Sequence, residues 1–241
     1  MKRQFLLIVL LLGTLFLSAC AGLRIVRGTG DMTEENREVS GFNAVALDGV
    51  GTIFIEQGDS ESLRIEAEDN LMKFLRTEVE GGTLKLTVRE GINIVPTQGV
   101  FYYLTVRDLE EIAVNGLGNV DLPDLKTPRL VLEINGGGEI NVQNLETGSL
   151  EVGINGLGSL NMDGGQVQGQ NISIDGGGSY DARHMLSETA DVSIKGLGSA
   201  ILWVQEQLDV TIDGGGSVQY TGKPQVTSEI SGLGEVRALE E

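Results

Sequence analysis

The chain of 241 residues contains one cysteine, one histidine, and 17 lysine and arginine residues against 35 aspartate and glutamate residues. One cysteine excludes an intrachain disulfide, and one cysteine with one histidine cannot supply the usual ligands of a structural zinc site. The formal net charge of −18 argues against nucleic acid and against docking by charge on anionic lipid, because both carry charge of the same sign. We therefore expect no nucleic-acid partner, no metal and no cofactor.

Sequence signatures of catalysis and of sugar stacking are also scarce. There is no G-x-S-x-G nucleophile elbow and no phosphate-binding G-K-[ST] loop. The solitary His184 is expected at the surface rather than as a general base. Aromatic residues make up 5% of the chain, which disfavours an extended sugar-stacking groove. Trp203 is expected to pack in the core, the alternative being an exposed platform for a sugar. We predict no catalytic residue.

The N-terminus has the features of a secretory leader. Lys2 and Arg3 precede an apolar stretch over residues 5–17. Its hydrophobic region of about 12 residues is too short to span a membrane as a helix. The tetrapeptide Leu17-Ser18-Ala19-Cys20 resembles the lipobox of bacterial lipoproteins, in which cleavage leaves the cysteine as the lipidated first residue. We predict a signal peptide over residues 1–19.

Lipidation at Cys20 would attach the mature chain to a membrane. Each buried methylene contributes about 0.8 kcal/mol, and the three acyl chains that the lipoprotein resemblance implies make such attachment permanent. Ala21 follows the cysteine, which in a Gram-negative cell implies sorting to the outer membrane. Residues 20–40 lack strong periodicity and are predicted to be a lipidated tether. Loss of the leader leaves 15 basic and 35 acidic residues, a net charge of −20.

Glycine is abundant and is arranged in a repeat. Of the 35 glycines, 17 belong to seven Gly-Leu-Gly or Gly-Gly-Gly triplets, whose first residues are spaced by 20, 20, 20, 20, 18 and 18 positions. The triplets begin at residues 116, 136, 156, 176, 196, 214 and 232. Apolar and polar residues alternate on both sides of each triplet, as in half-buried strands. We interpret each repeat as strand, glycine bend, strand and a turn such as 124–128.

This repeat predicts an all-β solenoid, a single-stranded parallel β-helix with coils of about 20 residues. One repeat cannot bury its own apolar side, whereas coils stacked about 4.8 Å apart share one core. The middle residue of the triplet alternates between leucine and glycine, so a leucine of one coil is expected to lie over a glycine of the next. The alternative is one coil for every two repeats, with a perimeter of about 130 Å that would be hard to fill.

The stretch before the repeat is less regular. We expect residues 41–110 to form a cap on the solenoid of residues 111–241, protecting its edge from aggregation. Within this cap, the alternating segments 52–56 and 63–67 are expected to pair with each other, and a short helical turn is expected to begin at Asp69.

Polar residues precede the glycine triplets and would form a ladder in a stacked solenoid. A row of this kind could bind a sugar or a cation, or it could be a solvated face with local hydrogen bonds. We favour the second interpretation, because the row recurs in every coil and no position marks one coil as special. The ladder residues are Asn115, Asn135, Asn155, Asp175 and Asp213.

Several segments resemble the head GIN domain family of bacterial, often lipidated, adhesin-like proteins. They are Phe42-Asn43-Ala44-Val45, Ile55-Glu56-Gln57-Gly58, the segment 66–71 and the repeated Gly-Leu-Gly motif, which occurs as Ile-Asn-Gly-Leu-Gly at 154–158. The resemblance covers about residues 41–238, and it implies a parallel β-helix of right-handed coil. Because no translocating barrel follows the repeat, we expect this chain to be anchored by lipid instead.

These observations predict a non-enzymatic lipoprotein of the cell envelope that acts as a surface interaction or adhesin-like module. Its expected partners are the membrane, through the lipid on Cys20, and an envelope protein or glycan. One alternative is a polysaccharide-active β-helix enzyme, which would need a charged cluster confined to one coil. The other is a structural component that associates with itself through the coil ends.

Overall fold

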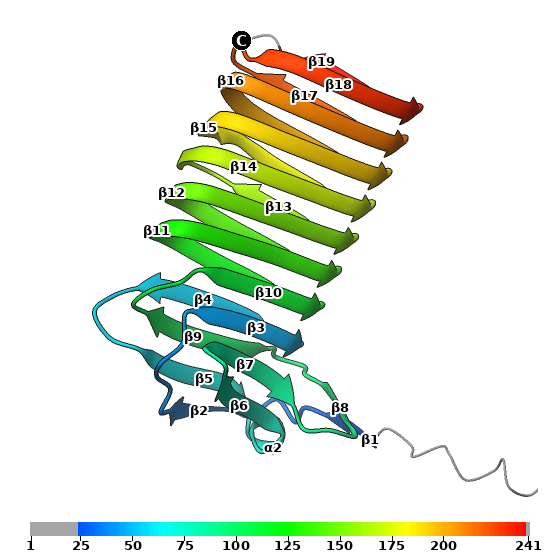
Figure 1. Cartoon of the computed structure of the whole chain (residues 1–241). Coiled ribbons are helices and arrows are strands. Elements are labelled where there is room, and N and C mark those ends of the chain that lie inside the picture. Colours follow the sequence, from blue (N-terminus) through cyan, green and yellow to red (C-terminus); the bar gives the residue numbers. More distant parts are fainter. Residues whose placement is uncertain (1–23, 240–241) are drawn as a thin grey trace, which may run out of the picture.

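The computed structural model describes residues 24–239, so the expected signal peptide and Cys20 lie outside the described residues. The strands form a solenoid that rises from an irregular cap (Figure 1). The cap contains β1 (Arg24–Arg27), β2 (Met32–Arg37), β3 (Ala44–Gly49), β4 (Thr52–Gln57), β5 (Ser62–Glu68), α2 (Asp69–Met72), β6 (Leu75–Glu80), β7 (Thr83–Val88), β8 (Ile92–Val95) and β9 (Val100–Val106). The solenoid contains β10 (Glu111–Gly116), β11 (Asn119–Gly136), β12 (Glu139–Gly156), β13 (Ser159–Met162), β14 (Gly165–Gly176), β15 (Ser179–Gly196), β16 (Ser199–Gly214), β17 (Ser217–Thr221), β18 (Gln225–Gly232) and β19 (Glu235–Ala238).

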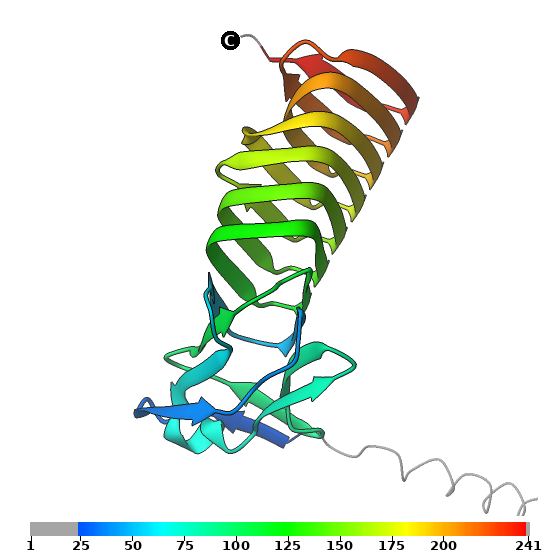
Figure 2. The same cartoon turned by 60° about the vertical axis from the view of Figure 1, so that its left-hand side comes forward.

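The solenoid strands are parallel, and the glycine triplets stack in register from coil to coil. Gly156 pairs with Gly136 below it and with Gly176 above it, each 20 residues away. Higher up, the offset from Gly196 to Gly214 is 18 residues. Figure 2 shows the coils as bent loops stacked along one axis. The register confirms a parallel β-solenoid with coils of about 20 residues and excludes the coil of 40.

Each coil has three inward-facing runs separated by three corners. In the coil that begins with β11, side A (residues 119–122), side B (124–127) and side C (129–135) each alternate between buried and outward residues. Two consecutive residues point outward at 123–124 and at 128–129, and these pairs make two of the corners. The third is the glycine corner, formed by the triplets. Aliphatic side chains from all three sides fill the interior, and each contributes about 1.5–3 kcal/mol when buried.

The segment 124–128 was expected to be a turn, and the structure places it within the strand instead. Asp124 pairs with Asn144, and Thr127 pairs with Thr147, in the ladder between β11 and β12. The inward Thr127 hydroxyl donates a hydrogen bond of 3.1 Å to the Arg129 carbonyl, and it does so across the corner. A side-chain hydrogen bond therefore braces this bend where no glycine is available.

The glycine corner requires glycine at its first position. Gly176 has a φ of 125°, in a region that favours glycine. A Cβ atom there would lie 2.6 Å from the Gly156 carbonyl oxygen, which accepts a hydrogen bond of 2.9 Å from the Gly177 amide. Both the backbone angle and the close approach of consecutive coils exclude a side chain.

The middle position of the triplet follows the expected pattern of leucine over glycine. A Cβ on Gly177 would lie 3.1 Å from Cδ2 of Leu157 in the coil below, and one on Gly137 would lie 3.2 Å from Cδ2 of Leu117. Each leucine therefore occupies the space that the next glycine leaves free. The leucine side chains point out of the solenoid, and they remain exposed.

One coil differs from the others in its interior, contrary to our expectation that no position marks a coil as special. Gln170 stands where neighbouring coils have Leu150 and Ala190, and its side chain is buried. Its Oε1 accepts a hydrogen bond of 2.7 Å from the buried Tyr180 hydroxyl. Its Nε2 donates one of 2.8 Å to Ser187 Oγ. These groups satisfy one another inside the core, so the difference is structural.

The cap continues the solenoid but has a more complex strand order than expected. β4 and β5 were expected to pair with each other. Instead β9 lies between them, parallel to β4 and antiparallel to β5. The predicted short helical turn is present as α2. Strands β3 and β4 pair with β10 and β11, so one ladder runs from the cap into the coils.

Much of the segment predicted to be a tether is paired with strands of the cap. Within the predicted tether of residues 20–40, β1 pairs with β8 and β2 pairs with β5. The buried carboxylate of Glu68 fixes the link between these strands, because it accepts hydrogen bonds from the Gly30 amide at 2.7 Å and from the Thr97 hydroxyl at 2.6 Å. Weak hydrophobic periodicity concealed this order, since polar contacts hold the segment.

Candidate binding surfaces

The predicted polar ladder lies in one column beside the glycine corner. Asn115, Asn135, Asn155, Asp175 and Asp213 occupy matching positions, with Lys195 between the last two. In the lower coils the amides bond to one another. Asn155 Nδ2 donates to Asn135 Oδ1 at 2.8 Å, and Asn135 Nδ2 donates to Asn115 Oδ1 at 2.8 Å.

The hydrogen-bonded part of the ladder ends on a carboxylate in the cap. Asn115 Nδ2 donates to Asp48 Oδ1 at 2.6 Å. All these side chains are exposed. Their amide groups donate hydrogen bonds to one another and accept them from one another, which stabilises the stacking of the coils. A second ladder on side A was missed by sequence reasoning. There Asn161 donates to Asn141 at 2.8 Å, and Asn141 donates to Asp121 at 3.1 Å.

An aromatic cluster on the outer face of the cap was also missed. Phe54 of β4 stacks on Tyr103 of β9, with ring centroids 5.3 Å apart and planes 19° apart. Phe101 adds a third ring, 6.4 Å from Phe54. The three rings are half-buried. They face outward in the columns that continue side A, and so form an apolar platform at the base of an otherwise polar face.

Charged groups surround this platform. The Arg64 guanidinium carbon lies 3.8 Å from the centroid of the Tyr103 ring, a cation–π contact. Arg64 also pairs with Glu34 at 3.3 Å and with Glu66 at 3.9 Å. The Tyr103 hydroxyl donates to Glu66 at 3.3 Å. These contacts fix the rotamers of Arg64 and Tyr103 before any ligand arrives.

A shallow groove of about 430 Å³ runs along the platform. We call it the aromatic groove. Its walls combine aromatic rings with an amide, a hydroxyl, a carboxylate and a guanidinium, so they offer apolar, donor and acceptor groups together. Its main lining residues are Asn36, Phe54, Glu56, Ser62, Arg64 and Tyr103. Sequence reasoning could not assemble it, because the residues come from four strands whose order depends on the inserted β9.

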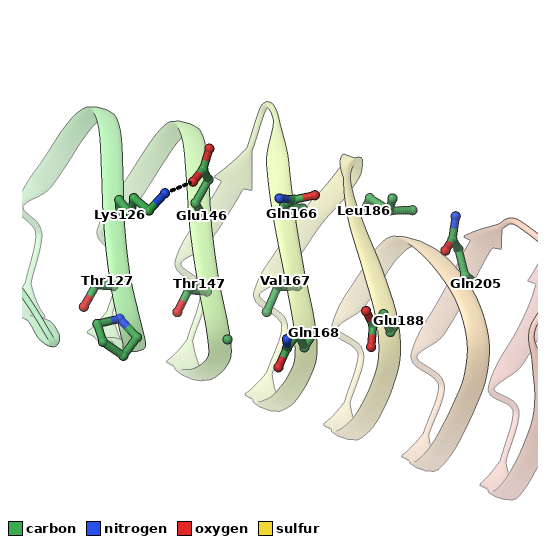
Figure 3. Close-up of a pocket in the computed structure, with 12 residues that line it drawn as sticks. Lys126, Thr127, Glu146, Thr147, Gln166, Val167, Gln168, Leu186, Glu188 and Gln205 are labelled. Carbon is green, nitrogen blue, oxygen red and sulfur yellow. Dashed lines mark ion pairs between the residues drawn. The ribbon is translucent and has the colours of Figure 1, made fainter.

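A second groove of about 510 Å³ crosses side B of several coils (Figure 3). Lys126 Nζ lies 2.7 Å from Glu146 Oε2, and this hydrogen bond raises the pKa of Lys126 above its usual value. Gln166 and Leu186 continue the same column upward. The side chains change from charged to amide to apolar along the groove, and they do not converge on one point (Figure 3).

Trp203 was expected to pack in the core, and the structure places it at the surface instead. Its side chain is 37% exposed. The coil of β16 lacks counterparts to residues 183–185 of the coil below, and Trp203 pairs with Leu186 just after this shortened corner. His184 is exposed, as expected, and stands within the three residues that the shorter coil omits.

Asp181 and Arg183 form a two-pronged ion pair near this corner. Arg183 Nε lies 2.9 Å from Asp181 Oδ1, and Nη2 lies 2.7 Å from Oδ2. Partial burial raises the pKa of Asp181, but the hydrogen bonds from Arg183 outweigh it and the net pKa is below the usual value. Asp181 is therefore ionised and held in the ion pair with Arg183, which suits a structural role better than proton transfer.

Residues 24–239 contain neither a metal-binding cluster nor a membrane-spanning helix. Within this range no group of three or more histidine, cysteine, aspartate or glutamate side chains is arranged to hold a metal ion. No helix in the same range is long and apolar enough to cross a membrane.

The fold closely resembles solved structures from Bacteroides and Parabacteroides species. A protein from Bacteroides fragilis NCTC 9343, described as a "putative adhesin", superposes with a TM-score of 0.84 at 23% identity, covering 89% of this chain and 100% of its own. A "putative lipid binding protein" from Parabacteroides distasonis ATCC 8503 gives 0.75 at 20% identity, covering 90% and 100%. A "putative adhesin" from Parabacteroides merdae ATCC 43184 gives 0.71 at 21%, covering 90% and 100%.

At these identities the structural likeness shows the fold alone. No curated protein matches the chain at a level that supports an argument. A family model does match, over residues 41–224, and its description is "Putative auto-transporter adhesin, head GIN domain". The matched range takes in most of the cap and the coils up to β17. The chain therefore belongs to the head GIN domain family of adhesin-like proteins, as its sequence motifs indicated.

Proposed function

We propose that this protein is a non-enzymatic, adhesin-like module of the cell envelope that binds a glycan in the aromatic groove. The observation that carries the proposal is the stack of Phe54 on Tyr103, with Arg64 held over the tyrosine ring. Sugars present C–H groups on one face and hydroxyls at the rim. The outward edges of these fixed rings form an apolar strip beside charged and amide groups, and this combination complements both features.

The surroundings of the groove favour an extended ligand. The side A face above Phe54 continues as the hydrogen-bonded column of Asp121, Asn141 and Asn161. A chain of sugars anchored on the rings would therefore meet amide and carboxylate groups at regular spacings of about 4.8 Å. This arrangement fits an oligosaccharide or polysaccharide better than a single small molecule.

We further propose that a lipid on Cys20 holds the module at the outer membrane. Three residues separate Cys20 from Arg24, where β1 begins. An extended chain of this length reaches no more than about 14 Å. The cap would therefore lie close to the membrane, and the coils would point away from it.

A glycan array tests the binding proposal. The chain without lipid, residues 21–241, contains every described residue and is compared with the Phe54→Ser/Tyr103→Ser variant. We expect glycan binding by the wild type and its loss in the variant, with both proteins keeping the same β-rich circular dichroism spectrum. Equal binding by both would overturn the assignment of the groove, and cleavage of a bound glycan would overturn the non-enzymatic role.

Mass spectrometry of the mature N-terminus tests the anchor separately. The expected species begins at Cys20 and carries acyl chains, and the Cys20→Ala variant is expected to leave the membrane fraction. An unmodified Cys20 or cleavage elsewhere would contradict lipid anchoring without affecting the glycan proposal.

A further inference from the structure

The glycine corner carries a row of exposed leucines that nothing in the described structure covers. Leu117, Leu157, Leu197 and Leu233 are 72%, 78%, 77% and 93% exposed, the most of any large apolar side chains in residues 24–239. They project from every second coil, so neighbouring leucines are about 9.6 Å apart. We call this row the leucine edge.

Between consecutive leucines of the leucine edge lies a coil with glycine at the same position, which leaves a gap about the width of a leucine side chain. Gly137, Gly177 and Gly215 occupy the alternate coils and present no side chain. A second edge shifted by one coil would place its leucines in these gaps, as knobs fit into holes. A closed pair of identical copies has a two-fold axis. Parallel copies related by such an axis oppose leucine to leucine, whereas antiparallel copies can oppose leucine to glycine.

We propose that the protein forms an antiparallel homodimer through the leucine edge. In this dimer Leu197 of one copy faces Gly177 of the second copy. By the same symmetry Leu157 faces Gly215 and Leu233 faces Gly137. Each copy contributes three leucines to the contact, and the symmetry makes every contact occur twice.

The charges beside the edge complement one another in this register. The ladder residue next to Gly177 is Asp175, and the one next to Leu197 is Lys195. The two-fold axis keeps the ladder columns on the same side of the contact, so Asp175 of each copy faces Lys195 of the other. One coil above Lys195 in the ladder, Asp213 of each copy faces Asn155 of the other. Two other antiparallel registers are shifted by two coils. One leaves Lys195 opposite Asn135, and the other pairs Lys195 with Asp213 but brings only two leucines of each copy into contact instead of three.

The opposite flank of the edge allows close approach. Ser159, Ser179, Ser199 and Ser217 follow the triplets of the central coils, and they meet only serines of the second copy. One unfavourable pairing, Glu139 against Glu235, falls at the ends of the contact. There Glu235 already lies 3.7 Å from Arg237.

The dimer would connect two surfaces. Antiparallel solenoids have their caps at opposite ends, and lipid anchoring at Cys20, on which this step rests, would place the two anchors on facing membranes. The contact spans six coils, from that of Gly137 to that of Leu233, and the five spacings between them make about 24 Å. An edge of this size is at the small end of specific interfaces, under about 1,200 Å². Single pairs are therefore expected to be weak, and many pairs between two surfaces would add together.

Sedimentation equilibrium of residues 21–241 up to millimolar concentration tests the dimer. We expect the mass to rise toward twice that of the monomer. Leu157→Ser/Leu197→Ser is expected to weaken association at least about 100-fold, because four buried leucines per dimer are lost. The control Val79→Ser removes an exposed apolar side chain of β6 away from the edge, and should change nothing. A wild type that stays monomeric, or a Leu157→Ser/Leu197→Ser variant that dimerises equally well, would overturn the proposal.

Crosslinking tests the register. Residues 21–241 contain no cysteine, so Asn155→Cys/Asp213→Cys supplies the only pair. These positions are three coils apart in one chain, about 14 Å, which is too far for an internal disulfide. We expect a disulfide-linked dimer from this variant and none from Asn135→Cys/Asp213→Cys. The opposite result would contradict the register.

The swap Asp175→Lys/Lys195→Asp should dimerise, whereas Lys195→Asp alone should weaken association about tenfold.

Vesicles test the bridging step. The chain beginning at Cys20 is coupled through that thiol to phosphatidylcholine vesicles containing a maleimide-headgroup lipid. Wild-type vesicles are expected to aggregate, and those carrying Leu157→Ser/Leu197→Ser to stay dispersed. Dimers in solution without aggregation would overturn bridging. Glycan binding by the leucine variant should be unchanged, so failure here is distinguishable from failure of the aromatic groove.

Discussion

Leu157 lies directly below Gly177 of the next coil, where an added Cβ would be 3.1 Å from the leucine Cδ2. The alternation that produces this contact runs the length of the solenoid. It keeps the glycine corner compact, because a leucine never stacks on a leucine of the adjacent coil, and it leaves a regular row of apolar knobs at the surface.

The first and middle glycines of a triplet should respond differently to substitution. Gly176→Ala places a methyl group at a φ of 125° and 2.6 Å from the Gly156 carbonyl oxygen, so we expect destabilisation by about 3 kcal/mol. Gly177→Ala meets only the flexible end of Leu157 and should cost less than about 1 kcal/mol. Urea unfolding of both variants measures the difference. Equal losses would show that the backbone angle is not the constraint.

The asparagine ladder should contribute to stability. Asn135 both donates and accepts a ladder hydrogen bond, so Asn135→Ala is expected to cost about 1–2 kcal/mol. Asn171 is an exposed asparagine of β14 whose side chain makes no hydrogen bond within residues 24–239, and Asn171→Ala serves as the control. Thermal melts compare the two. A larger loss for the control would contradict the role of the ladder.

Removing one member of the buried network of Gln170, Tyr180 and Ser187 should destabilise the fold more than removing two members together. Tyr180→Phe leaves the Gln170 side-chain oxygen without its donor inside the core, and we expect a loss of about 1–3 kcal/mol. Adding Gln170→Leu, which introduces the residue found at Leu150, removes the stranded amide. Ser187 keeps its bond to the Trp203 carbonyl at 2.9 Å. The double variant is expected to recover much of the loss. A double variant less stable than Tyr180→Phe would refute this account.

Stability should depend on acid through Glu68. Burial raises the pKa of Glu68, but hydrogen bonds from the hydroxyl and amide of Thr97 and from the Gly30 amide outweigh burial and lower the pKa below its usual 4.5. A lowered pKa means that the ionised group stabilises the fold above pH 4.5. This contribution is lost as the pH falls through the folded-state pKa.

The Glu68→Gln variant isolates that contribution. Urea unfolding should show the wild type more stable than Glu68→Gln at pH 7, and the gap should close as the pH falls below 4.5. Thr97→Val removes one of the donors and should shift the acid transition of the wild type toward higher pH. A gap between wild type and Glu68→Gln that is the same at pH 3 and pH 7 would exclude the carboxylate as its cause.

The glycine triplets allowed the solenoid to be predicted, because a fixed spacing implies stacking and positive φ leaves glycine as the suitable residue. The other two corners carry a weaker signal. Two adjacent outward residues follow Leu122, and a threonine precedes the next pair at 128–129. That threonine acts through a backbone hydrogen bond, which alternation of apolar residues does not reveal.

The aromatic groove could not be predicted, for a topological reason. Phe54 and Tyr103 are 49 positions apart, and they become neighbours only because β9 inserts beside β4. Similarly, Trp203 was assigned to the core from its apolar neighbours, whereas the shortened corner before it turns the side chain outward. Repeats are visible in sequence, while insertions into a sheet and missing corners are visible only in the fold.

Calorimetric titration of the glycan selected on the array tests the central proposal most directly. The proteins are the wild type, Tyr103→Ala in the aromatic groove, and Trp203→Ala at an exposed aromatic residue outside the groove. We predict that Tyr103→Ala weakens binding at least about tenfold, equivalent to about 1.4 kcal/mol, and that Trp203→Ala binds as the wild type does. Unchanged affinity for Tyr103→Ala, or a loss confined to Trp203→Ala, would contradict a glycan site in the aromatic groove.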